Sequence, residues 1–88
     1  MPGYKYANIT ADTLLKTGAG KVAGFIINSH TTGALKLWDN TSAATTVLMN
    51  TYTFPSGSSV VTFPMPICFN TGLYADITNT VDLTIIFD

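Results

Sequence analysis

The sequence contains very little charge. Four lysines and five aspartates are the only charged residues among 88, whereas hydrophobic residues make up 47% of the chain. A soluble domain usually carries about 25% charged residues, and this charge keeps separate molecules apart in solution. A chain with 10% charged residues is therefore expected to cover much of its surface with other protein, as part of an assembly.

Cysteine and histidine are each present once, as Cys68 and His30. A disulfide within the chain is therefore excluded, and one histidine with five scattered aspartates does not predict a metal site. A chain of this length forms one domain that hides only about 60–65% of its unfolded surface, and such domains rely on disulfides, metals or oligomerisation for stability. Oligomerisation is the route that remains, and we expect no cofactor and no metal.

Clustered positive charge and long apolar runs are also missing. Four dispersed lysines and no arginine cannot neutralise a nucleic-acid backbone, so we expect no direct nucleic-acid partner. The longest apolar runs, such as residues 85–87, are far shorter than the about 20 residues of a membrane-spanning helix. The N-terminus shows no basic segment followed by an apolar run, so we expect neither a membrane partner nor a signal peptide. One unpaired thiol is compatible with assembly in a reducing cytoplasm.

The apolar residues that are present alternate with polar ones, as in β-strands. The pattern is clearest in residues 81–88 and recurs in residues 34–38, and polar turn signals separate such segments about every 8–12 residues. Pro64 and Pro66 place their segment at a sheet edge or a crossing between sheets. The sequence therefore predicts an all-β fold, a small antiparallel β-sandwich of jelly-roll type with seven or eight short strands and little or no helix. Further strands are expected at Thr13–Thr17, Lys21–Asn28, Thr45–Phe54 and Ser59–Phe63.

Residues 11–88 are expected to form the single sandwich domain, and residues 1–10 stand apart. Tyr4 and Tyr6 lie on one face of a short extended piece, which is either an arm that reaches a neighbouring subunit or a first strand. Residues 22–28 are apolar on both faces. Ala23, Phe25 and Ile27 are expected on one face, and Val22, Gly24 and Ile26 on the other. This strand is either central or has a subunit pressed on its outer side.

Trp38 is expected on the outer face of its strand, because it alternates with Leu35 and Leu37. Three interpretations remain open for this side chain: it covers the rim of the sandwich, it anchors a protein interface, or it stacks on a sugar ring. The candidate interface residues from the sequence are Tyr4, Tyr6, Val22, Ile26 and Trp38.

None of the motifs that carry chemistry is complete. Residues 18–21 lack the first glycine and the Ser/Thr of a phosphate-binding loop and precede a strand, so a hairpin turn is expected there. His30 lies in a polar turn and is expected to be solvated, and Asp39 is expected to form a turn by bonding the backbone. Cys68 has no histidine or lysine beside it in sequence that would activate the thiol, and it is expected to be a small, half-buried side chain. We expect no catalytic residue and no enzymatic activity.

Several of these strand and turn segments resemble small β-sandwich structural proteins encoded by tailed bacteriophages. The resemblance lies in residues 15–28, 34–43, 69–73 and 82–85 and covers about residues 13–87. It rests on a strand, a polar turn, a second strand and an Asp-Asn-Thr-Ser-Ala turn, followed by a late Thr-Gly-Leu and a final alternating strand. Tyr4-Lys5-Tyr6 has no counterpart in the resemblance.

The resemblance implies a non-enzymatic virion protein, most often a capsid decoration (cement) protein that stabilises the phage head. Relatives of this kind are commonly oligomers and often trimers, so the implied partners are further copies of the chain and the major capsid protein or another virion protein. The implied location is the virion, assembled in the host cytoplasm. Two alternatives remain, a tail, neck or head-fibre component, and a carbohydrate-binding module in which Trp38, Tyr4 or Tyr6 stacks on host glycans.

Overall fold

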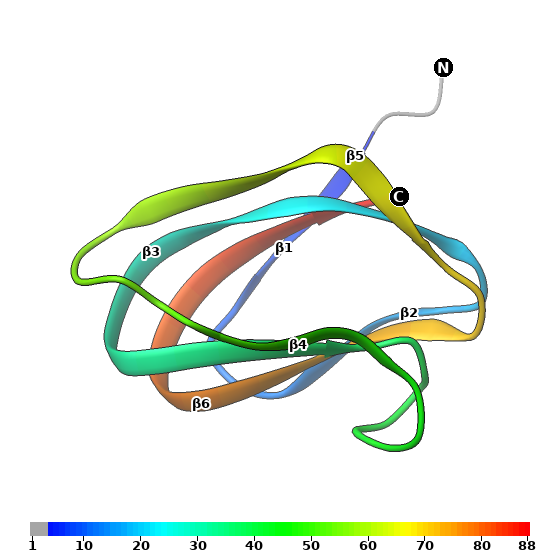
Figure 1. Cartoon of the computed structure of the whole chain (residues 1–88), viewed down its shortest axis with the longest axis horizontal. Coiled ribbons are helices and arrows are strands. Elements are labelled where there is room, and N and C mark those ends of the chain that lie inside the picture. Colours follow the sequence, from blue (N-terminus) through cyan, green and yellow to red (C-terminus); the bar gives the residue numbers. More distant parts are fainter. Residues whose placement is uncertain (1–3) are drawn as a thin grey trace.

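The computed structural model describes residues 4–88, and this part of the chain is an antiparallel β-sheet of six strands without a helix (Figure 1). Residues 4–88 accordingly include no helix of the length and apolarity that a bilayer crossing requires. The expected all-β, antiparallel class is confirmed. The strands are β1 (Lys5–Ile9), β2 (Thr13–Thr17), β3 (Gly20–Trp38), β4 (Val47–Thr53), β5 (Ser59–Phe69) and β6 (Gly72–Phe87).

Two long strands, β3 and β6, form the centre of the sheet. They pair with each other along most of their length, while β1 and β2 pair with the outer side of β6 and β4 and β5 pair with the outer side of β3. Both strands bend at the same level, on the left of Figure 1. At the bend Thr32 and Asn79 have positive φ angles of 46° and 64°, and the Asn79 side-chain amide donates a hydrogen bond of 2.8 Å to the carbonyl oxygen of Thr32.

The bend divides the sheet into two halves that share one core. The β5 half consists of β1, β5 and residues 20–29 and 81–87 of the long strands, and the β4 half consists of β2, β4 and residues 34–38 and 72–78. Alternation decides which side chains enter the core. The predicted inward residues Leu35, Leu37, Val81, Leu83, Ile85 and Phe87 are all buried.

Residues 4–88 form six strands, and not the expected seven or eight. Polar turns are expected to separate the strands, but the polar segments at residues 29–33 and 78–80 bend β3 and β6 without interrupting them. A positive φ at one residue in each segment redirects the chain while pairing continues on both sides.

The N-terminal segment and the proline segment both lie at sheet edges. Residues 1–3 of the expected arm lie outside the described part, and Lys5–Ile9 is β1, which pairs with the C-terminal part of β6. Pro64 and Pro66 lie in β5, whose one partner among the described strands is β3. Of the two expected places, a sheet edge or a crossing between sheets, the structure shows the edge, because no second described strand pairs with β5. The ladder with β3 skips from Val22–Ile67 to Gly24–Thr62 and leaves residues 63–66 unpaired.

Candidate interaction site

The candidate interface residues do not form one site. Tyr6 and Ile26 share the outer face of the β5 half, Trp38 lies on the outer face of the β4 half, and Tyr4 precedes β1 with 48% of its surface exposed. Val22 is fully buried, so its expected place on the outer face is wrong.

A bulge in β3 explains the burial of Val22. The register with both neighbouring strands shifts between Val22 and Gly24, and the extra residue puts Val22 on the same inner face as Phe25 and Ile27. Gly24 has φ +154°, and a Cβ at this position would collide with the carbonyl oxygen of Val61. Only glycine fits this conformation and this close approach of β5.

Apolar side chains are exposed on the outer face of the β5 half. In one row of cross-strand neighbours, Ile26 of β3 lies between Thr84 of β6 and Val60 of β5. In the next row, Ile86 of β6 lies between Tyr6 of β1 and Gly24 of β3, which has no side chain. Tyr6 and Val60 are 76% and 65% exposed. We call Tyr6, Ile26, Val60 and Ile86 the β5-half face.

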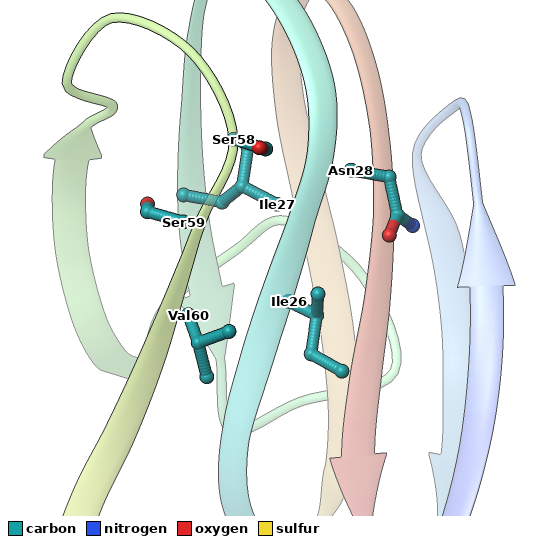
Figure 2. Close-up of a pocket in the computed structure, with 6 residues that line it drawn as sticks. All are labelled: Ile26, Ile27, Asn28, Ser58, Ser59 and Val60. Carbon is teal, nitrogen blue, oxygen red and sulfur yellow. The ribbon is translucent and has the colours of Figure 1, made fainter.

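A shallow depression of about 430 Å³ opens at the end of this face (Figure 2). Figure 2 shows Ile26 and Val60 on neighbouring strands, with Asn28, Ser58 and Ser59 above them. The walls combine three apolar residues, Ile26, Ile27 and Val60, with hydroxyl and amide groups and contain no charge. Such a surface suits a protruding uncharged side chain of a partner protein.

The polar groups next to the β5-half face bind one another. The amide of Asn8 donates to Asp82 Oδ1 at 2.8 Å and to Thr84 Oγ1 at 3.3 Å, and the amide of Asn28 donates to the same two atoms at 3.3 and 3.2 Å. These bonds connect β1, β6 and β3 across the sheet. They hold the strands in register and leave the neighbouring apolar side chains as the groups available to a partner.

Trp38 lies in an apolar row across the β4 half. Leu14, Tyr74, Trp38 and Val47 are cross-strand neighbours on β2, β6, β3 and β4. The ammonium group of Lys36 lies 4.4 Å from the centroid of the Trp38 ring, and the indole Nε1 is buried without a hydrogen-bond partner. A cation on the ring face competes with a sugar for stacking, and a buried N–H cannot bond a sugar hydroxyl. The geometry favours a rim or protein-contact role over glycan stacking.

Asp39 joins the end of β3 to the turn between β5 and β6. Its carboxylate accepts hydrogen bonds from the backbone N–H groups of Asn70, Thr71 and Gly72, at distances from 2.8 to 3.4 Å. Desolvation alone would raise the pKa of the Asp39 carboxyl, but the backbone N–H groups outweigh it and lower the pKa below the ordinary value of 3.8. The expected backbone bonding of Asp39 is confirmed, although the bonded turn lies far along the chain.

His30 and Cys68 occupy places that the sequence did not indicate. His30 is not merely solvated, because Gly33 N donates to its Nδ1 at 3.0 Å and its Nε2 donates to the Pro55 carbonyl at 2.6 Å. The ring thus connects the bend of β3 to the loop before β5. Cys68 is exposed rather than half-buried. Within residues 4–88 no three His, Cys, Asp or Glu side chains gather as metal ligands would.

The exposed residues Val60 and Met65 were not among the sequence-based candidates. Val60 is 65% and Met65 77% exposed, and both belong to the edge strand β5. The sequence signal for these residues is the run 60–67, in which apolar residues occupy both faces and two prolines prevent regular pairing on one side.

Comparison with models of known protein families, with curated proteins and with solved structures gives no match to this chain.

Proposed function

We propose that this chain is a non-enzymatic structural protein of a tailed-phage virion, a decoration protein that binds the capsid as a homotrimer and stabilises the shell. The proposed architecture is a small sandwich of jelly-roll type, in which the two halves of the bent sheet are the two layers. The resemblance in residues 13–87 supports this assignment, together with a composition in which only 10% of residues carry charge.

The observation that carries the proposal is the exposed β5-half face. Tyr6 and Val60 are largely exposed while the neighbouring Asn8 and Asn28 amides bond Asp82 and Thr84 within the sheet. Exposed apolar groups beside satisfied polar groups are typical of a protein-binding surface. On a capsid, this face would lie across a junction between shell subunits, and many copies would resist expansion of the shell under packed DNA.

Binding of the purified protein to shells from which it has been stripped tests the proposal. We expect a fixed number of copies per shell, and we expect Tyr6→Ser and Val60→Ser to weaken binding at least about tenfold, which corresponds to about 1.4 kcal/mol. Leu14→Ser, a truncation of an exposed apolar residue on the β4 half, is the matched control and should bind as the unchanged protein does. Protein that stays in solution beside intact shells rules out decoration.

Binding assays with the same purified protein also distinguish the two alternative functions, a tail or neck component and a carbohydrate-binding module. Binding to isolated tails or necks instead of shells would assign the chain to those parts of the virion. Retention on host glycans that is lost in Trp38→Ala would assign it to carbohydrate binding, although the Lys36 ammonium over the Trp38 ring argues against that result.

A further inference from the structure

The charge of this molecule is confined to part of the chain. Residues 40–75 contain no Asp, Glu, Lys, Arg or His, and this stretch includes all of β4 and β5. Every lysine and aspartate lies in residues 5–39 or 76–88, which include β1, β2 and β3 and most of β6.

The two uncharged strands lie on one side of the molecule. β4 and β5 both pair with β3 on the side away from β6, so each is an edge strand, one in each half. In Figure 1, β5 runs along the top and β4 lies in the lower half, above β6, and the loop before Ser59 joins β4 to β5 on the left. We call the surface formed by β4 and β5 the uncharged side.

Apolar side chains are only partly covered on the uncharged side. Tyr52 of β4 and Phe63 of β5 both contact the core residue Phe25, with ring centroids 5.9 and 6.2 Å apart, yet neither is fully buried. Five of the eight partly buried hydrophobic residues that pack on the core belong to these two strands: Leu48, Met49, Tyr52, Val61 and Phe63. Met65 of β5 adds a side chain that is 77% exposed.

The two edges differ in their capacity for further pairing. β5 carries Pro64 and Pro66 in its unpaired segment, and prolines at an edge prevent the addition of another strand. β4 has neither proline nor charge, and Val47–Thr53 is rich in β-branched and aromatic residues. Such an edge pairs readily with another strand.

We propose that copies of this chain associate through the uncharged side, with β4 of one copy against the uncharged side of the next, head to tail, as a closed trimer requires. A partner surface of ordinary composition would bury charged groups against a side that offers no counter-charge, which is costly. A second copy brings a surface that is also uncharged and an edge with the same unpaired backbone groups. The inference deepens the proposed function, since it assigns the contact between copies of the chain to β4 and to the part of β5 around Met65. Tyr6, Ile26 and Ile86 of the β5-half face lie on other strands and remain for the shell, and Val60 is the one residue of that face that belongs to β5.

The experiment measures the association constant of the purified chain by sedimentation equilibrium. Two variants place a charge at exposed positions of the uncharged side, Thr51→Glu on β4 and Met65→Glu on β5. Two matched variants place the same charge at exposed positions of the opposite edges, Tyr6→Glu on β1 and Leu14→Glu on β2. We expect the first pair to weaken association at least tenfold and the second pair to leave it within about twofold.

A second measurement needs no variant. Amide hydrogen exchange of the unchanged protein, compared between dilute and concentrated solutions, should show slower exchange in Val47–Thr53 on association and no change in Lys5–Ile9. The inference is wrong if the unchanged protein is monomeric. It is also wrong if Thr51→Glu and Met65→Glu leave association intact, or if Tyr6→Glu and Leu14→Glu abolish association. Binding to stripped shells is scored separately, so a protein that binds shells as a monomer contradicts this inference and not the decoration function.

Discussion

Gly24 determines which residues of β3 reach the core. Its φ of +154° and the nearby Val61 carbonyl allow the bulge that turns Val22 inward together with Phe25. At position 24, no side chain covers the outer face of the sheet next to Ile26, because glycine has none. One residue therefore affects both the packing of the core and the shape of the exposed face.

Gly24→Ala is predicted to lower the free energy of unfolding by about 1–3 kcal/mol, because it adds backbone strain and a collision with the Val61 carbonyl. Urea denaturation measures the change. Gly57→Ala is the matched control, since Gly57 also has a positive φ of +82° but no atom within 4 Å of an added Cβ. Its loss should be smaller, and an equal loss in the two variants would contradict the role given to the close approach.

Asp39 is predicted to make stability depend on acid pH. Its pKa is lowered in the folded chain, so its contribution is fully present above the ordinary value of 3.8 and is lost as the pH falls from there through the lowered folded-state pKa. Asp39→Asn should cost about 1 kcal/mol at neutral pH, because the bonds to Asn70, Thr71 and Gly72 lose their charged acceptor.

Urea denaturation at neutral and acid pH checks the Asp39 prediction. The difference in unfolding free energy between the unchanged protein and Asp39→Asn should shrink as the pH falls below 3.8. A difference that stays constant over this range would show that the backbone bonds do not stabilise the charged carboxylate.

At the scale of elements, the paired bends of β3 and β6 create the two halves of the sheet. Thr32 and Asn79 have positive φ, and the Asn79 amide holds the Thr32 carbonyl across the bend. Asparagine tolerates this conformation, whereas a β-branched residue resists it. The amide of Asn79 is thus both a local hydrogen-bond donor and a means of keeping two long strands bent at one level.

Asn79→Val is predicted to destabilise the fold by about 1–3 kcal/mol, because it forces a β-branched side chain into positive φ and removes the bond to Thr32. Thermal unfolding followed by circular dichroism measures the effect. Asn79→Gly relieves the strain and loses only the hydrogen bond, so its unfolding temperature should lie between those of the other two proteins. A glycine variant less stable than the valine variant would argue against strain at this bend.

The elements were predictable where local pattern decides the structure. Alternation identified the inward residues of Val81–Phe87, and the bounds expected for Thr13–Thr17 agree with β2. The bulge at Gly24 was not predictable, because it depends on the approach of the Val61 carbonyl from another strand. The bond of His30 to Pro55 depends likewise on a contact between segments 25 residues apart.

At the scale of the whole molecule, the distribution of charge predicts how association responds to salt. Salt screens charged contacts and leaves apolar contacts largely unscreened. If the uncharged side is the interface, the association constant should change by less than about threefold between low and moderate ionic strength. Sedimentation equilibrium in a sodium chloride series measures it, and a steep loss of association with added salt would point to the lysine- and aspartate-bearing surfaces instead.

The central position of β6 bears on how this protein is made in the cell. β6 is the only described strand that pairs with β1 and β2, and it forms the longest ladder with β3. A nascent chain therefore cannot complete either half of the sheet until Gly72–Phe87 has left the ribosome. Until then, the apolar strands that precede it lack their main partner and are open to aggregation. Folding of this domain therefore waits for Gly72–Phe87, and a low concentration of nascent chains should favour the correctly folded product.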